Sequence, residues 1–379
     1  MGWSIPELPQ LQQIKRPSYL LWAITGVVMM ALGLVLTLFL YHNNDAAQFW
    51  LFAIGLPFTL WLLMLTCRSV YYAFLKSTND EISQHQQAIT RQWQNWSQVQ
   101  LPIFGHYIIC AEPDGLKALT SDSVSIPLYP QKVRPLYNAS ASTKPYWFLD
   151  EVMMNLAQQC ADYRRYLTHI YLPNELIEDE DLIDAIFQRW DLRPQPVKDY
   201  GVLMAQMYEN PAEVELSLLL VCQYDDDTYH YHSKFISALL LGQEALMNKS
   251  GMLAKAWLGR LMFTGEAELS TDIGQLFRYN QLPPKKVKAI WISGLNDKTR
   301  LALTMASGEL NVGGQHGVTF HDIDLTFAKP SKLTHYFVLT MASSRVGQSF
   351  REQLTVSRNQ GAIYVQLISP KKFESEQDR

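Results

Sequence analysis

Two long uncharged runs near the start of the chain constrain its fold more than any other feature. Residues 19–41 and residues 46–67 contain no Asp, Glu, Lys or Arg. Roughly 20 consecutive apolar residues are enough for a helix to cross the hydrocarbon core of a bilayer. A signal peptide has a shorter apolar stretch and a small-residue cleavage site. The two runs therefore predict a hairpin of two transmembrane helices within residues 1–75.

Basic residues predict the orientation of this hairpin. Lys15 and Arg16 precede the first run, Arg68 and Lys76 follow the second, and the connecting loop has neither Lys nor Arg. The positive-inside rule then places both ends in the cytoplasm. No charged residue lies inside either run, which argues against an ion path or a proton relay. We expect an inner-membrane anchor of bacterial type, in contact with the lipid bilayer, with both termini and the rest of the chain cytoplasmic.

Two details of the runs bear on how the helices pack. Pro57 interrupts the second run and predicts a kink, because proline cannot donate a backbone hydrogen bond. Gly26, Gly33 and Gly55 would let the two helices approach closely.

Beyond the hairpin, the pattern predicts a helical linker over residues 76–100 and an α/β domain over residues 101–379. Buried strands are expected at 106–110, 169–172, 215–221, 235–241, 255–262, 288–293 and 361–369, and helices at 149–166, 177–189, 270–279 and 333–344. Continuous apolar strands separated by helices favour a layered α/β fold whose sheet is covered on both faces.

The composition excludes several kinds of partner and site. The formal net charge is −4 and 48% of the residues are hydrophobic, so neither nucleic acid nor an anionic membrane surface is indicated as a partner. The four cysteines, Cys67, Cys110, Cys160 and Cys222, are too far apart in sequence for a CxxC redox pair or a zinc-binding set. We expect buried free thiols in a reducing compartment.

Two clusters have the residue types of a polar site. Residues 225–232 (DDDTYHYH) could bind a transition metal, but they fall between two apolar strands, where a polar turn is expected. His321, with Asp322 and Asp324 nearby, could act as a general base. The acidic residues 178–181 begin a predicted helix and complement its dipole.

No sequence motif supplies a nucleophile or a phosphate loop. The chain has no GxSxG, HExxH, P-loop or GxGxxG pattern, and the glycines of residues 311–317 predict a turn. We therefore predict no catalytic residue, no cofactor and no metal.

Aromatic side chains predict a surface for a protein partner. Trp93 and Trp96 lie one turn apart on the linker, and Tyr146, Trp147 and Phe148 follow one another in the domain. Exposed aromatic residues often mark interfaces. Few basic residues are interleaved with them, which argues against stacking on nucleic acid bases.

The C-terminal half of the chain resembles the corresponding half of thiolase-like folds, the β-ketoacyl synthase superfamily. The similar segments are ELSLLLV (215–221), FISALLLG (235–242), KAIWISGLNDKTRLAL (288–303), HDIDLTFAKPSKLTHYFVLTMASS (321–344) and GAIYVQLI (361–368). The resemblance implies a thiolase-like layered α/β domain.

The chain departs from that superfamily at the positions that matter for chemistry. Condensing enzymes use a nucleophilic cysteine at the start of a helix and usually two histidines. At the two expected histidine turns, this chain has Ser293, Gly294 and Leu295, and then Ala328, Lys329 and Pro330. No cysteine lies in a small-residue turn. The resemblance therefore implies a fold kept without its condensing residues.

This layout, two spans followed by a degenerate thiolase-like domain, resembles membrane proteins encoded with bacterial type VI secretion systems. That resemblance implies a non-enzymatic adaptor or scaffold for a secretion component or effector. Two alternatives stay open: a membrane-anchored acyl-transfer or lipid-related enzyme, and an immunity or regulatory membrane protein.

Reporter fusions after Lys76 test the predicted topology. Because basic residues flank a loop that has none, this position should lie in the cytoplasm. Alkaline phosphatase fused there should be inactive, and a fluorescent protein should fluoresce. A fusion at Asn43 in the loop is the matched control and should show the reverse. An active phosphatase after Lys76 would contradict the topology.

Overall fold

The computed structural model describes residues 2–6, 8–40, 46–112, 132–138, 146–209, 214–224, 231–328, 330–359 and 361–373. The chain divides into two compact units. One, the hairpin unit, is Pro6–Gln92. The other, the α/β unit, contains Trp93–Arg379 together with Met1–Ile5. The hairpin unit is thus inserted between two parts of the α/β unit in the sequence.

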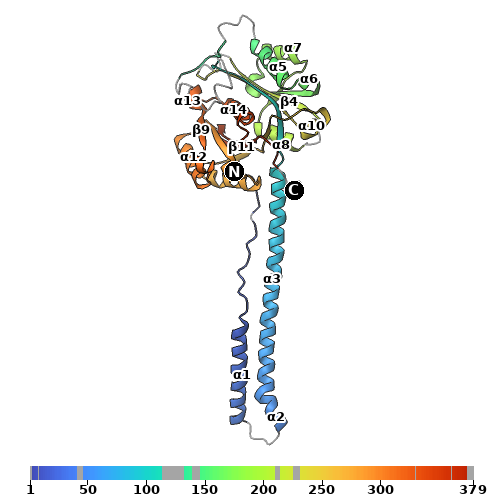
Figure 1. Ribbon diagram of the computed structural model, residues 1–379, viewed down its shortest axis with the longest axis vertical. Coiled ribbons are helices and arrows are strands. Elements are labelled where there is room, and N and C mark those ends of the chain that lie inside the picture. The colour runs from blue at the N-terminus through green and yellow to red at the C-terminus, as the bar shows by residue number, and fades with distance from the viewer. Residues whose placement is uncertain are drawn as a thin grey trace. The chain divides into compact units, whose positions relative to one another are not determined.

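The hairpin unit is built from two long helices. Its elements are α1 (Tyr19–Leu40), α2 (Ala46–Trp50), the π-helix η1 (Leu51–Gly55) and most of α3 (Leu56–Ser97). Figure 1 shows α1 beside the first part of α3. Tyr19–Leu40 and Ala46–Ser97 each contain a stretch that is long and apolar enough to cross a membrane, and only 11% of each stretch is buried. Nothing among the described residues covers most of this apolar surface.

The second apolar run changes its helical geometry just before Pro57. The π-helix η1 occupies Leu51–Gly55, and regular α-helix resumes at Leu56. A wider turn beside a proline accommodates the carbonyl that proline leaves without a donor. The kink predicted at Pro57 stays a prediction, and what the structure adds is a π-helical turn directly before the proline.

Two glycines allow the hairpin helices to approach each other. A Cβ on Gly33 would lie 2.4 Å from Cγ of Pro57, and one on Gly26 would lie 2.8 Å from the Trp61 ring. Trp61 donates through Nε1 to the carbonyl of Trp22 at 2.8 Å. The predicted close approach is confirmed at Gly26 and Gly33. It is wrong for Gly55, where a Cβ would meet no atom closer than 3.9 Å.

The α/β unit consists of two halves that share one main order of elements, β-α-β-α-β-α-β-β, with short additional helices and strands in each. The first half contains β1 (Leu101–Ile109), α5 (Trp147–Gln159), α6 (Tyr163–Tyr166), β2 (Leu167–Pro173), η2 (Asn174–Leu176), α7 (Glu180–Trp190), β3 (Gln195–Val197), α8 (Tyr200–Glu209), β4 (Leu216–Gln223), β5 (Phe235–Gly242) and α10 (Glu244–Ser250). The second contains β6 (Ala256–Leu258), β7 (Met262–Thr264), α11 (Leu269–Tyr279), η3 (Pro284–Lys286), β8 (Val287–Ser293), α12 (Asp297–Glu309), η4 (Gly314–His316), β9 (Thr319–Asp322), α13 (Ile323–Phe327), α14 (Thr334–Ser349), β10 (Glu352–Asn359) and β11 (Ala362–Ser369).

Strand pairing repeats in the two halves. The described strands form one 11-stranded sheet in the order β3-β2-β4-β5-β1-β6-β11-β10-β8-β9, with β7 paired to β11. In the first half β2 is parallel to β3 and β4, and β4 is antiparallel to β5. In the second half β8 is parallel to β9 and β10, and β10 is antiparallel to β11. The fold is therefore a duplicated mixed sheet whose halves join at β1 and β6.

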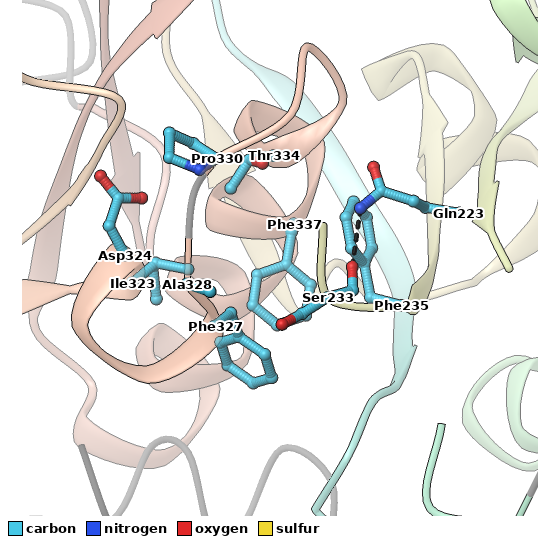
Figure 2. A pocket seen from close by; sticks show the side chains of 10 residues that line it. All are labelled: Gln223, Ser233, Phe235, Ile323, Asp324, Phe327, Ala328, Pro330, Thr334 and Phe337. Atoms are coloured by element: carbon cyan, nitrogen blue, oxygen red, sulfur yellow. Dashed lines mark hydrogen bonds between the residues drawn. The ribbon is translucent and has the colours of Figure 1, made fainter. Parts of the chain in front are cut away.

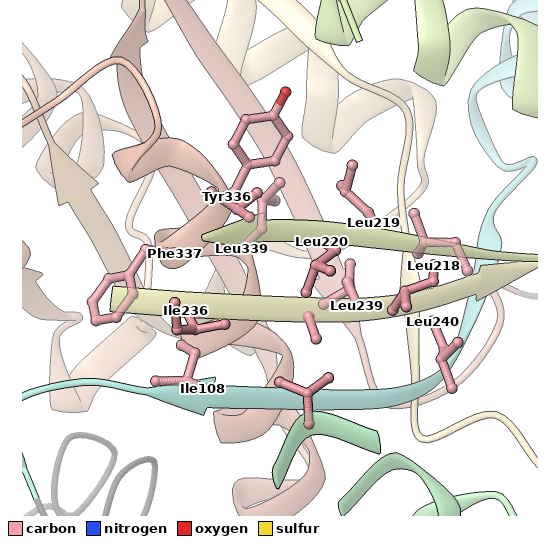
Figure 3. Close-up of a cluster of buried hydrophobic side chains, with 14 of the residues drawn as sticks. Ile108, Leu218, Leu219, Leu220, Ile236, Leu239, Leu240, Tyr336, Phe337 and Leu339 are labelled. Carbon is pink, nitrogen blue, oxygen red and sulfur yellow. The ribbon is translucent and has the colours of Figure 1, made fainter. Parts of the chain in front are cut away.

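Helix α14 lies in the middle of this arrangement. Every residue from Thr334 to Val346 is buried. The helix contacts β1 and β5 of the first half as well as β8, β10 and β11 of the second. Figure 3 shows Tyr336, Phe337 and Leu339 beside the leucines and isoleucines of β4, β5 and β1.

Helix α8 completes the middle layer. It belongs to the first half, but its Tyr200 hydroxyl donates to Gln366 Oε1 of β11 at 3.1 Å. Its Tyr208 hydroxyl donates to the carbonyl of Gly259, next to β6. The outer helices form two pairs, α5 with α7 and α11 with α12. The layered α/β fold predicted from the sequence is confirmed.

The details differ in places. The predicted helix 149–166 is interrupted at Cys160, and the predicted strand 255–262 is two short strands, β6 and β7. Strands β3, β9 and β10 and helices α8 and α10 were not predicted. The polar run 225–230 lies outside the described residues. The acidic residues do begin a helix, α7, and Asp179 also caps it by accepting a hydrogen bond from the Leu182 amide at 2.9 Å.

Truncating a side chain in the shared core tests this architecture. Leu220 of β4 is fully buried, whereas Leu301 on α12 is 62% exposed. Leu220→Ala should lower the free energy of unfolding of the full chain in detergent by about 2–5 kcal/mol, because it removes apolar contacts and leaves a cavity. Leu301→Ala should change it by less than about 0.5 kcal/mol. The measurement is thermal unfolding of both variants. An equal loss in the free energy of unfolding for Leu220→Ala and Leu301→Ala would contradict the assigned core.

Candidate functional site

A small cavity lies where the two middle helices begin. Its volume is about 30 Å³, enough for a water molecule. The residues lining it are Glu175, Val197, Lys198, Asp199, Tyr200, Lys332, Leu333, His335, Tyr336, Asn359 and Tyr364. Most of them come from the starts of α8 and α14 and from the carboxyl ends of β3 and β10, whereas Glu175 lies in η2 and Tyr364 in β11. Ligand sites of α/β sheets are commonly found outside the carboxyl ends of strands, so this is the candidate site of the fold.

A side chain caps α8 at this cavity. Asp199 accepts hydrogen bonds through Oδ1 from the amides of Gly201 (2.7 Å) and Val202 (3.3 Å) at the start of α8. The start of α8 thus offers less to an anion than an uncapped terminus would. A hydrogen-bonded turn precedes α14: the Ser331 amide donates to Thr334 Oγ1 at 2.8 Å, and the Leu333 amide donates to Ser331 Oγ at 3.1 Å.

His335 is the most unusual group in the cavity. Its side chain is 4% exposed, and burial lowers the pKa of the imidazole from 6.5 to about 3. Nδ1 lies 3.2 Å from the Lys332 carbonyl oxygen and 3.3 Å from Nδ2 of Asn359. Nε2 is buried without a hydrogen-bond partner in the described part of the chain. The ring is neutral at neutral pH and has one nitrogen available to a water or a polar ligand.

Three tyrosines surround the imidazole. The His335 ring centroid lies 5.0 Å from that of Tyr200, 3.7 Å from that of Tyr336 and 5.7 Å from that of Tyr364. Burial raises the pKa of each of these phenols, so they stay protonated at neutral pH. The floor of the cavity is aromatic and uncharged.

None of the four cysteines lines this cavity. Cys67 lies within α3, Cys110 follows β1, Cys160 ends α5 and Cys222 lies within β4. Burial raises the pKa of the Cys110 thiol to about 12 and also raises those of Cys160 and Cys222. None of these three is a thiolate at neutral pH. Asp199 and Tyr200, rather than a cysteine, occupy the start of α8.

A second cavity of about 10 Å³ lies on the other side of the start of α14. Figure 2 shows its lining, which includes Gln223, Ser233, Phe327, Phe337 and Asp324. It has room for at most one water. Gln223 donates to the Ser233 carbonyl at 2.7 Å across its wall.

The predicted His-Asp cluster beside that cavity has a structural role. Arg300 of α12 pairs with Asp322 at 2.7 Å and with Asp324 at 3.4 Å. Asp324 also accepts hydrogen bonds from Ser293 Oγ (2.7 Å) and from the Gly294 amide (2.8 Å). These contacts tie the turn after β8 to α12 and α13.

His321, the third member of that cluster, packs on an aromatic ring. It stacks on Trp291 with ring centroids 4.2 Å apart.

A larger cavity of about 310 Å³ opens beside the amino ends of β2 and β4. Its polar lining includes His169, Glu215, Ser217 and Gln243. His169 Nδ1 lies 3.4 Å from Glu215 Oε2, and both side chains are partly exposed. Sequence analysis did not single out these residues, because they are contributed by separate strands.

The residues predicted to form a partner surface fall into two separate groups. Trp93 and Trp96 pack edge to face 5.1 Å apart, and Trp96 is 38% exposed. Tyr146 and Trp147 are half-buried at the start of α5, which lies away from residues 93–97 in Figure 1. Phe148 is 3% exposed and belongs to the core. It contributes nothing to a surface, because the first turn of α5 directs it toward Tyr224.

Two of the residues expected at the second histidine turn, Ala328 and Pro330, lie before α14, which begins at Thr334, and Lys329 lies outside the described residues. The histidine in the first turn of this buried helix is His335.

Comparison with known proteins identifies the fold. No protein-family model and no curated protein matches the chain. Solved structures do match. The first is a chain from a complex of a type II polyketide synthase acyl-carrier protein with its ketosynthase: 12% identity, TM-score 0.52, covering 72% of this chain and 99% of that one.

Two further ketosynthases give the same result. An oxazolomycin ketosynthase domain from Streptomyces albus JA3453 is 10% identical with a TM-score of 0.51, covering 72% of this chain and 96% of that one. The ketosynthase from module 1 of the bacillaene synthase of Bacillus amyloliquefaciens FZB42 is 9% identical with a TM-score of 0.51, covering 74% and 75%.

The α/β unit therefore has a thiolase-like, ketosynthase-like fold. The resemblance predicted from the C-terminal half is confirmed at the level of fold. The similarity covers more than that half, since it includes 72% of the chain. Two helices apolar enough to span a membrane precede this unit in the sequence.

The buried imidazole gives the chain a pH-dependent stability. Above pH 6.5 His335 is neutral in both the folded and the unfolded chain. Between pH 6.5 and about 3 the unfolded chain binds a proton that the folded chain does not. The free energy of unfolding should therefore fall as the pH falls through this window.

Replacing His335 tests this. In His335→Gln the free energy of unfolding should fall less steeply as the pH falls. The fall should not disappear, because burial also lowers the pKa of His106, to about 4. His85→Gln, on the exposed surface of α3, is the control and should follow the wild-type profile. The measurement is thermal unfolding of the full chain at a series of pH values. An unchanged profile for His335→Gln would show that the imidazole is not buried as described.

Proposed function

We propose that this chain is a membrane-tethered adaptor or scaffold, in which a thiolase-like α/β unit binds a protein partner and performs no condensation. The observation that carries the proposal is the candidate cavity. Its described lining contains Asp199 and Tyr200 at the start of α8, and no cysteine. Covalent acyl transfer needs an activated nucleophile, and the three buried thiols are held in their protonated form.

The size and polarity of the cavity support a role without substrate. A volume of about 30 Å³ admits water but not an acyl chain. The pocket is filled by the rings of Tyr200, Tyr336 and Tyr364 around His335. In this proposal the residues that line the cavity stabilise the fold, and the fold presents a binding surface to a protein partner.

The hairpin unit supplies the tether. Its two apolar stretches are long enough to span a bilayer and only 11% buried, so lipid is the natural partner of their surface. With the basic residues Lys15, Arg16, Arg68 and Lys76 on the cytoplasmic side, we propose that the α/β unit lies in the cytoplasm at the inner membrane. Tethering raises the local concentration of the unit near membrane-embedded partners.

The partner class is the one that the sequence resemblance implies, a component or effector of a bacterial type VI secretion system. The accessible members of the predicted surface are Trp93, Trp96, Tyr146 and Trp147, since Phe148 is buried. Trp147 is the best site to test, because it begins α5 and is partly exposed.

One observation favours the rival role of a membrane-anchored acyl-transfer or lipid-related enzyme. His335 places a neutral imidazole in the cavity, and its Nε2, which has no partner among the described residues, can accept a hydrogen bond from a substrate or from water. That role needs the cavity to open and a nucleophile to be supplied by the substrate or by water.

Affinity capture from the native bacterium separates the two roles. The tagged full chain, solubilised from membranes, should retain a type VI secretion component or effector. Trp147→Ala should reduce the captured amount, because truncating an aromatic interface residue commonly costs more than about 1 kcal/mol. Leu301→Ala, an exposed apolar residue on another helix, is the control and should not.

Each variant should first be shown to unfold at the wild-type temperature. If the full chain captures no protein, and instead co-purifies with a lipid or an acyl thioester, the adaptor role is wrong and the enzyme role replaces it.

A further inference from the structure

We infer that residues 2–5 form a clasp with Trp96 and Arg260, which closes the hairpin unit into a loop with both of its ends fixed at one place on the α/β unit. We call this set of residues the clasp. All of them belong to the α/β unit, although residues 6–92 separate the two segments in the sequence. The inference is independent of the proposed function.

Residues 2–5 are held by burial and by hydrogen bonds. Trp3 is 9% exposed and joins the apolar cluster of the second half, which includes Met262, Leu269 and Ile273. Its Nε1 donates to the Leu261 carbonyl at 3.2 Å. A tryptophan this deeply buried stabilises the folded chain far more than an exposed side chain does, because its burial removes a large apolar area from water.

Gly2 fits closely beside an acidic side chain. A Cβ at this position would lie 2.2 Å from Oδ1 of Asp272, which is itself 5% exposed. No residue other than glycine can occupy that space without moving the segment or the carboxylate. Close packing at both Gly2 and Trp3 therefore holds residues 2–5 on the second half of the α/β unit.

The second segment of the clasp is the end of α3. Trp96 packs edge to face on Trp3, with ring centroids 5.2 Å apart and planes at 89°. Trp93 packs on Trp96 from the previous turn at 5.1 Å. The two segments thus hold each other directly through aromatic contacts, which are worth more than their buried area alone.

Arg260 joins this aromatic group to the middle layer of the fold. Its guanidinium carbon lies 4.2 Å from the Trp96 ring centroid and 4.8 Å from that of Tyr208 on α8. Its Nε donates to the Trp96 carbonyl at 2.6 Å. Arg260 is 8% exposed, so these cation–π contacts are shielded from water and are stronger than surface ones.

A clasp of this kind holds together the two points at which the chain leaves and re-enters the α/β unit. Residues 6–92 leave the α/β unit after Ile5 and return to it at Trp93, so the clasp closes them into a loop in the covalent chain.

Hydrogen exchange of the full chain in detergent micelles or nanodiscs tests the clasp. Trp3→Ala should speed exchange of the backbone amides of residues 93–98 by about tenfold or more, since the last turn of α3 loses its packing partner. Ser4→Ala, an exposed residue of the same segment, is the matched control and should leave exchange unchanged. The amides of β4 and β5 report whether the core stays folded.

The outcomes are decisive in each direction. Faster exchange at residues 93–98 with unchanged β4 and β5 supports the clasp, and unchanged exchange at residues 93–98 overturns it. If Trp3→Ala also loosens β4 and β5, Gly2→Ala decides, because it displaces the segment without removing Trp3. Faster exchange at residues 93–98 in Gly2→Ala supports the clasp, and wild-type exchange there overturns it.

Discussion

The whole α/β unit depends on burying one helix from both sides. Residues Thr334–Val346 of α14 are all buried, between strands of the first half and strands of the second. Buried polar groups usually need partners, and hydroxyls of this helix bond to carbonyls of the preceding turn. Thr340 donates to the Tyr336 carbonyl at 3.0 Å and Ser343 to the Leu339 carbonyl at 2.7 Å. Small residues whose hydroxyls form hydrogen bonds within the helix let the strands of both halves pack closely against α14.

The candidate cavity follows from the same constraint. Because α8 and α14 both begin between the half-sheets, their first turns meet there, with His335 and Tyr200 in contact. The residues at that place are an aspartate, a tyrosine and a neutral histidine. The described residues supply no thiolate there.

Sequence reasoning succeeded where one physical signal dominates. The hairpin followed from the absence of charge over two long runs, and β4, β5 and α14 followed from nearly continuous apolar residues. It failed where the signal is short or distributed. Strand β3 has only 3 residues, two of them exposed, and the duplication of the two halves lies in strand order rather than in residue identity.

The candidate site was recovered only in part, for similar reasons. His335 was overlooked because it stands within an apolar run, where a histidine resembles a core residue. The burial of Trp3 depends on partners more than 250 positions away, such as Leu261, and no local pattern reveals them. Phe148 was assigned to a surface together with its sequence neighbours Tyr146 and Trp147. Its position on the first turn of α5 directs its side chain into the core, whereas the two neighbours stay half-buried.

The central claim is that this thiolase-like unit binds and does not form acyl-enzyme. The most direct measurement is the intact mass of the full chain, purified from membranes and then incubated with an acyl-coenzyme A as the acyl donor. The account predicts the unmodified mass, because Cys110, Cys160 and Cys222 are protonated and buried away from the cavity. An added acyl group that maps to one of these cysteines, or to a residue lining the cavity, would contradict it.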